Sequence, residues 1–295
     1  MMKIRKLLIC VCMMAALTGC SSNKENKDEN NNDNSILEEN RVEVNVYNNL
    51  VTETEQNEIK PLLQNAQLSN VDTFFSWVKD FNGTMKEDVG LVEKWTPLKD
   101  LNYDTTYKND EMAIAWDETH EQQGDANSRI AAFLLMDGLI EAPEYEEYGS
   151  YILMDMEQIE TDPMFEKIKP DMYKYSAVFD EVDLSIVKTQ EEFDNAFPDA
   201  WAKRGVTFAA NKAALINVVV QSPLDNLAFI AHSGVRIQED TYVLFIEKVD
   251  YCNAYQVSRF EDERALVEEL RRRTYLVGDE AFDMVVLAND KVIRM

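Results

Sequence analysis

The chain has 295 residues and a formal net charge of −26, from 55 acidic and 29 basic residues. Such a chain is poorly suited to nucleic acid, whose binding rests on Lys and Arg neutralising phosphates, so we expect no nucleic-acid partner. With only two His and four Cys, it offers no cluster of soft metal ligands, and we expect neither a metal nor another cofactor.

The N-terminus has the layout of an export signal. Three basic residues, Lys3, Arg5 and Lys6, precede an uncharged apolar run from Leu7 to Leu17. A basic start, a short apolar middle and small residues at the end are typical of a signal peptide. The run is shorter than the roughly 20 apolar residues that a membrane-spanning helix needs. Residues 1–19 are therefore predicted to be a signal peptide rather than a permanent span.

The apolar run ends in Leu17-Thr18-Gly19-Cys20, which resembles the lipobox of bacterial lipoproteins. In those proteins the Cys thiol receives a diacylglyceryl group and the chain is cleaved just before it. Two acyl chains, such as palmitate, hold a protein at a membrane far better than one. Cys20 is therefore predicted to anchor the chain to the outer, extracellular face of a bacterial membrane. An ordinary signal peptide with a chance Cys is the alternative.

Residues 20–40 are polar and rich in Asn, Asp and Glu, with almost nothing to bury. Such a stretch cannot offset the entropy of ordering, so we expect a disordered spacer. Residues 41–295 are predicted to form a single domain. If Cys20 is acylated, Cys252 is left without an intrachain partner, and no disulfide is expected.

Apolar periodicity predicts mainly helices in the first two thirds of this domain. A strand at 41–47 comes first, because Val alternates there with other residues. The expected helices span residues 54–67, 71–81, 130–140 and 189–197. The Asn82-Gly83 pair predicts a turn, whereas 84–127 and 143–170 show no clear period.

From residue 214 the pattern changes to strands. The expected strands span 214–221, 227–237, 242–249 and 255–260, followed by a charged helix at 261–273 and a terminal hairpin at 285–293. Glu239-Asp240 is the expected turn between the second and third of these strands. Helices first and an antiparallel sheet second predict an α+β fold, with N-terminal helices packed on a C-terminal antiparallel sheet.

Three polar positions in this pattern form a candidate site. Ser128 begins the apolar helix, and His232 and Glu247 interrupt two neighbouring strands. If these strands pair around the Glu239-Asp240 turn, His232 and Glu247 lie at comparable distances from it and can touch. A buried carboxylate needs such a partner. The structural alternative is an ordinary helix cap and a hydrogen-bonded core His.

This order resembles the papain-like layout of NlpC-type cell-wall peptidases and amidases. There a Cys opens a helix packed on an antiparallel sheet, and a His-x-Gly-Val/Ile strand supplies the base, which His232-Ser233-Gly234-Val235 matches. The resemblance implies Ser128 as nucleophile, His232 as base and Glu247 as the group that orients it. Because Ser replaces Cys, Ser128 would need His232 to take its proton, or the site is degenerate.

The chain also resembles a family of bacterial surface lipoproteins labelled as domain of unknown function number 4300, from about Tyr47 to the C-terminus. The matching stretches are residues 47–50, 74–78, 127–130, 132–135, 232–235, 244–248 and 255–256. The helix-start motif of that family is Asn-Cys-Arg, which implies a cysteine-centred site from which Ser128 departs. The resemblance implies a lipoprotein and a fold more than a substrate.

Two functions from different classes stay open. One is a papain-like amide or peptide hydrolase with Ser in place of Cys, or a degenerate relative. The other is a non-catalytic extracellular module that binds a peptide, glycan or partner protein. Either would have the membrane as a partner through Cys20, with a cell-wall peptide or surface protein as the further candidate. A transporter substrate-binding protein is disfavoured, because no repeated parallel units appear.

Cys252 and His120 are two further residues whose side chains could take part in a site. Cys252 is a rival nucleophile, but no basic residue lies beside it in the Asp250-Tyr251-Cys252 segment, so a buried structural thiol is expected. His120, in an acidic stretch, is expected to be a solvent-facing loop residue that could line the same cleft as Ser128.

Overall fold

One large antiparallel sheet organises the computed structural model, which describes residues 42–120, 123–276, 278 and 281–294. The predicted signal peptide (1–19), the acylated Cys20 and the spacer (20–40) lie outside the described residues. Nine strands of the described part form the sheet, in the order β11-β10-β6-β7-β8-β9-β1-β2 with β4 on β7. They are β1 (Val46–Asn48), β2 (Thr96–Pro97), β4 (Val182–Asp183), β6 (Ala213–Gln221), β7 (Leu227–Gln238), β8 (Val243–Lys248), β9 (Tyr255–Phe260), β10 (Val285–Ala288) and β11 (Lys291–Val292).

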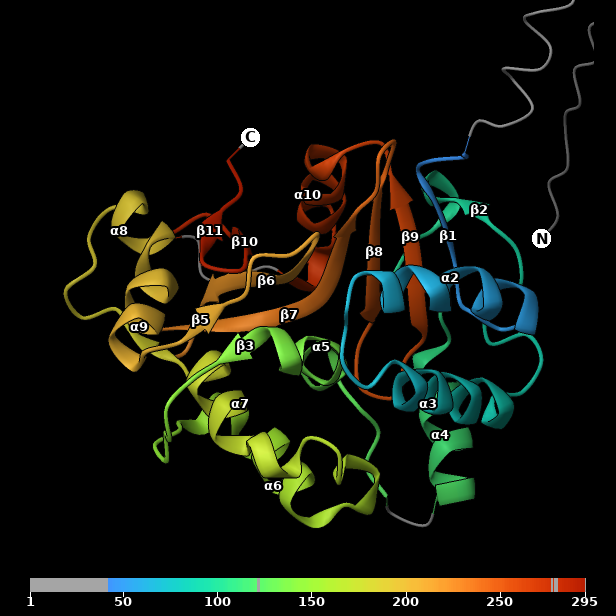
Figure 1. Ribbon diagram of the computed structural model, residues 1–295, viewed down its shortest axis with the longest axis horizontal. Coiled ribbons are helices and arrows are strands. Elements are labelled where there is room, and N and C mark those ends of the chain that lie inside the picture. The colour runs from blue at the N-terminus through green and yellow to red at the C-terminus, as the bar shows by residue number, and fades with distance from the viewer. Residues whose placement is uncertain (1–41, 121–122, 277, 279–280, 295) are drawn as a thin grey trace, which may run out of the picture. The chain divides into compact units, whose positions relative to one another are not determined.

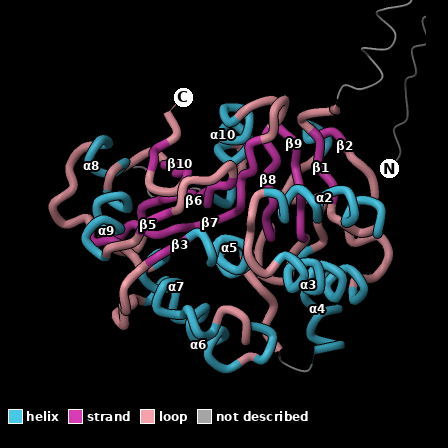
Figure 2. Tube along the Cα trace, in the orientation of Figure 1, coloured by secondary structure: helices cyan, strands magenta, loops and turns pink. Residues whose placement is uncertain are grey.

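Helices cover both faces of this sheet (Figures 1 and 2). They are α2 (Glu53–Asn65), α3 (Val71–Thr84), α4 (Asn109–His120), α5 (Ser128–Met136), α6 (Leu153–Thr161), α7 (Met172–Phe179), α8 (Gln190–Asp194), α9 (Ala196–Arg204) and α10 (Glu263–Arg271). The apolar helix α5 packs on β6, β7 and β8, while α10 packs on β8 and β9 from the other side. The predicted α+β class, with N-terminal helices and a C-terminal antiparallel sheet, is confirmed.

Side-chain contacts show which residues of β7 and β8 face each layer. Arg236 of β7 lies 3.5 Å from Glu263 of α10, so its face of the sheet is the α10 face. Lys248 of β8 lies over the ring of Phe81 in α3, 3.4 Å from its centroid, and therefore faces the α3 and α5 layer. Because successive residues of a strand alternate between faces, Glu247 points toward α10.

Several predicted boundaries in the N-terminal half were wrong. The first strand covers only Val46–Asn48, where it pairs with β9, and Val42 before it is 38% exposed. The predicted turn at Asn82-Gly83 is the last turn of α3, because Asn82 Nδ2 donates to the carbonyls of Asn49 and Leu50. The helix predicted at 130–140 ends at Met136, and the short strand β3 (Ile140–Glu141) follows, paired with β5 (Thr207–Phe208).

Helices α4 and α6 occupy segments in which no period was predicted, and α7 follows them in a stretch for which no element was predicted. α4 and α6 bury only three residues each, which in α4 are Met112, Ala115 and Trp116. A stripe this narrow is easily hidden in an acidic sequence. Every helix of the described residues is too short or too polar to cross a membrane.

Candidate functional site

His232 and Glu247 form a buried pair on the α10 face. β7 and β8 are antiparallel, with Val235 opposite Ile246, and this register brings the two polar residues together just beyond the last paired position. His232 Nε2 lies 2.6 Å from Glu247 Oε2, and their exposed fractions are 1% and 2%. The sequence-based expectation that these two side chains can touch agrees with this geometry.

Arg273, directly after α10, holds the same carboxylate with both ends of its guanidinium. Its Nη1 donates to Glu247 Oε2 at 2.6 Å and its Nη2 to Oε1 at 2.8 Å, the bidentate geometry of strong arginine–carboxylate pairs. Gln256 Nε2 donates to Oε1 at 3.1 Å. Burial alone would raise the pKa of Glu247, but Arg273 and His232 outweigh it and lower the pKa to about 2. Glu247 is therefore an ionised, fully compensated carboxylate.

Tyr103 closes this group on the outer side. Its hydroxyl accepts from Arg273 Nη2 at 2.6 Å and from Gln256 Nε2 at 3.1 Å, and the Arg273 guanidinium lies 4.2 Å from its ring centroid. Burial raises the pKa of Tyr103 well above its ordinary value, so the phenol stays protonated. We call Tyr103, His232, Glu247, Gln256 and Arg273 the Glu247 cluster.

Ser128 begins α5 but bonds to backbone rather than to an imidazole. Asn127 caps the helix by accepting from the Ile130 N–H at 3.0 Å, which leaves Ser128 as the first helical residue. Ser128 Oγ accepts from the backbone N–H of Ser233 at 3.3 Å, and the residue is only 5% exposed. Among the described residues, no hydrogen bond joins Ser128 Oγ to the His232 ring.

Strand alternation explains this separation. The β6–β7 register is regular from residue 232 to 237, so His232 projects to the α10 face, as Arg236 does, and Ser233 projects to the α5 face. Ser128 approaches the strand from the α5 side and meets the backbone of Ser233. The structure thus brings His232 to Glu247, and it places Ser128 beside the same strand without pairing it with the imidazole.

A glycine is required where the two strands separate. A Cβ on Gly234 would lie 2.3 Å from the Phe245 ring and 2.9 Å from the Ile246 carbonyl oxygen, so no side chain fits there. The Gly in the His-x-Gly-Val stretch therefore has a packing reason that is independent of catalysis.

A second buried ion pair lies on the α5 face. Lys248 Nζ is 2.7 Å from Asp125 Oδ2, and both side chains are completely buried. Burial raises the pKa of Asp125 and lowers that of Lys248, while their mutual attraction opposes both shifts. The pair ties the segment before Ser128 to the end of β8.

The contacts of Cys252 and His120 indicate that both residues have structural roles. Cys252 is a free, buried thiol as expected; its N–H donates to Asp125 at 3.0 Å, and burial, reinforced by Asp125, raises its pKa to about 12. Such a thiol is a poor nucleophile. His120 is not a loop residue, because it is the last residue of α4. Its ring stacks on that of Trp116 with the centroids 3.6 Å apart, and its Nε2 lies 3.2 Å from Asp80 Oδ2.

Sequence reasoning missed Arg273, Gln256 and Tyr103. The sequence marks Gln256 and Arg273, the two that bond to Glu247, only weakly. Gln256 lies within the strand predicted at 255–260, and Arg273 is the last of three consecutive arginines at the end of the helix predicted at 261–273. No group of three or more His, Cys, Asp or Glu side chains in the described residues is placed to hold a metal ion.

The fold and these contacts define an α+β protein with buried ion pairs on both faces of its central sheet. The family model described as Domain of unknown function (DUF4300) matches residues 46–293, and the chain belongs to this family. The resemblance to domain of unknown function number 4300 is thereby confirmed. Comparisons with curated proteins and with solved structures give no match.

Proposed function

We propose that this protein is a bacterial surface lipoprotein whose folded domain is a non-catalytic binding module. The signal-like residues 1–19 and the lipobox ending at Cys20 support export and acylation. The polar residues 21–40 would hold the domain away from the membrane, where it meets extracellular ligands such as cell-wall peptides or surface proteins.

The observation that favours binding over catalysis is the partner of Ser128 Oγ. A general base must come within hydrogen-bond reach of the proton it removes. Ser128 Oγ instead accepts from the Ser233 N–H, and the Glu247 carboxylate that contacts His232 is also held by Arg273. Ser128 and His232 are also 95% or more buried, which gives a substrate little access to either.

A papain-like hydrolase with Ser128 as nucleophile is the second candidate, and one observation favours it. His232 Nε2 is hydrogen-bonded to Glu247, whereas His232 Nδ1 forms no hydrogen bond with the described residues. A base that is oriented through one ring nitrogen and free at the other is the arrangement that an activated nucleophile requires. Because Ser128 approaches β7 from the α5 side and His232 projects to the α10 face, this hydrolase would require a rearrangement that brings both side chains to one face of the sheet.

An activity assay separates these candidates. Wild type, Ser128→Ala and Ser128→Cys are incubated with cell-wall peptides and generic ester substrates, with the exposed Ser185→Ala as the matched serine control. We expect no turnover above background in any of them. We also expect His232→Gln to lower the free energy of unfolding by about 1–3 kcal/mol, because Glu247 loses a buried partner. Wild-type turnover that falls at least a hundredfold in Ser128→Ala would instead establish the hydrolase, and turnover only in Ser128→Cys a degenerate enzyme.

Anchoring is tested separately by Cys20→Ser in the producing cell. Wild type is expected to fractionate with membranes and to incorporate an alkyne-labelled palmitate, whereas Cys20→Ser loses the label, because no other residue can take the diacylglyceryl group. Cys252→Ser is the matched control and is expected to keep the label. Equal labelling of Cys20→Ser and wild type would refute the lipoprotein proposal.

A further inference from the structure

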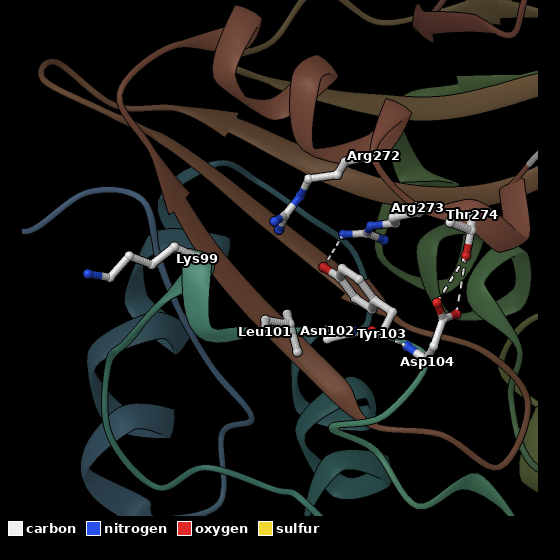
Figure 3. Close-up of a pocket in the computed structure, with 8 residues that line it drawn as sticks. All are labelled: Lys99, Leu101, Asn102, Tyr103, Asp104, Arg272, Arg273 and Thr274. Atoms are coloured by element: carbon white, nitrogen blue, oxygen red, sulfur yellow. Dashed lines mark hydrogen bonds between the residues drawn. The ribbon is translucent and has the colours of Figure 1, made fainter. Parts of the chain in front are cut away.

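A pocket of about 300 Å³ opens beside the Glu247 cluster, between the segment around residues 99–104 and the end of α10 (Figure 3). Three of its lining residues are basic, Lys99, Arg272 and Arg273, and one is acidic, Asp104. The chain as a whole has almost twice as many acidic as basic residues. The pocket therefore reverses the charge balance of the protein.

Several cationic donors of this pocket are free to bind a ligand. Arg272 is about half exposed and uses Nη2 on Glu269 and the Leu98 carbonyl, while its Nη1 and Nε bond to none of the described residues. Lys99 is exposed and likewise forms no ion pair with them; in Figure 3 it stands at one side of the lining residues, and its side chain extends away from them. Both residues also line an adjoining hollow of about 320 Å³, which leaves space for a ligand larger than a single anionic group.

The charge around the pocket selects the kind of anion. Each arginine already faces one carboxylate of the chain, Glu269 for Arg272 and Glu247 for Arg273, and Asp104 bonds to Thr274 at 3.2 Å. These three carboxylates balance the charges of Lys99, Arg272 and Arg273, so a monovalent carboxylate fits better than a phosphate monoester of about −1.5 to −2. Both guanidinium groups already bind a carboxylate of the chain itself, which is the chemistry that the ligand would offer.

We propose that this pocket binds the free carboxylate of a peptide ligand, a proposal that rests on the binding function above and names its ligand class. The carboxylate lies against Arg272 and Lys99, and the rest of the peptide follows the adjoining hollow. Arg273 forms the inner wall of the pocket and holds Glu247, which bonds to His232. A bound ligand is therefore expected to affect the imidazole of His232 through the Arg273–Glu247 and Glu247–His232 contacts.

Binding of a defined probe tests the proposal on the full chain in detergent micelles. The probe is an acetylated tri-alanine peptide with a free carboxylate, and its C-terminal amide and inorganic phosphate are the comparisons. We expect calorimetric titration to show the amide and phosphate binding at least about tenfold more weakly than the free acid. Arg272→Gln and Lys99→Gln are each expected to weaken the free acid by about tenfold. Lys86→Gln removes an exposed cation that is paired with Glu118 and lines neither hollow, so it is the matched control and should change nothing.

The position of the ligand is read from the two histidines. With ¹³C-labelled His, the free acid is expected to shift the ring resonance of His232 and to leave that of His120 unchanged. The spectrum of His120→Gln shows which of the two resonances belongs to which histidine. Equal affinity for acid and amide, tighter binding of phosphate, or an unmoved His232 would overturn the proposal. A failure here leaves the activity assay on Ser128 unaffected, so loss of this site and loss of the binding function are distinguishable.

Discussion

Arg273→Met is expected to lower the free energy of unfolding by about 3–5 kcal/mol, because it leaves the Glu247 carboxylate buried without its bidentate partner. Both side chains are completely buried, so water cannot replace the guanidinium. His232 and Gln256 keep one hydrogen bond each to the carboxylate but supply no permanent charge. The measurement is urea unfolding at pH 7, followed by tryptophan fluorescence.

The pH dependence of this loss has a definite sign. In the wild type the folded-state pKa of Glu247 is lowered from 4.5 to about 2, which corresponds to roughly 3 kcal/mol of stability. That contribution is present above pH 4.5 and is lost as the pH falls toward 2. In Arg273→Met, burial prevails and raises the pKa of Glu247, so the protonated carboxyl is tolerated and the difference from wild type should shrink below pH 4.5.

Two comparisons make the result specific to the Glu247 cluster. Arg272→Met removes the adjacent, half-exposed arginine and should cost less than about 1 kcal/mol. Arg273→Met combined with Glu247→Leu removes the charge that was left unpaired and should recover part of the loss. A double variant as unstable as the two single losses added together would show that Arg273 and Glu247 do not act as a pair.

The sequence predicted the C-terminal sheet better than the N-terminal helices, for a physical reason. Strands β6 to β9 are long apolar runs that are joined in sequence order, so their pattern and their neighbours are both local properties. The short β1 is a strand because it pairs with β2, about 50 residues away, and with β9, more than 200 residues away. Helices α4 and α6 owe their stability to narrow apolar stripes, which packing selects and composition hides.

The candidate site was predictable only where it depended on hairpin register. His232 and Glu247 are equally far from the Glu239-Asp240 turn, and the β7–β8 pairing, which ends at Val235 and Ile246, leaves them near enough for their side chains to meet. Register cannot show which layer Ser128 approaches, because that depends on how α5 lies on the sheet. Arg273 could not be assigned either: the sequence marks it as part of a charged helix, and its burial follows from where α10 ends.

Lys248→Met is expected to have an effect of similar size on the opposite face of the sheet. It leaves Asp125 completely buried, without its charge partner and with backbone N–H donors from Ala126 and Cys252 only. We expect a loss of about 3–5 kcal/mol at pH 7. Because burial already raises the pKa of Asp125, removing Lys248 raises it further, and the loss should diminish as the pH is lowered through the acidic range.

A thiol measurement shows whether this pair also holds the turn after β8. The Cys252 N–H is bonded to Asp125, and Lys248 Nζ donates to the Asn253 carbonyl, so the pair fixes both residues. Lys248→Met should therefore increase alkylation of the Cys252 peptide by at least about tenfold under native conditions. Lys212→Met, which removes a partly exposed partner of Glu239, should leave alkylation and stability nearly unchanged. If the two variants behave alike, the buried pair contributes no more than a surface pair, and the segment before Ser128 must be positioned by Asp155, which accepts from Asn127 at 2.6 Å.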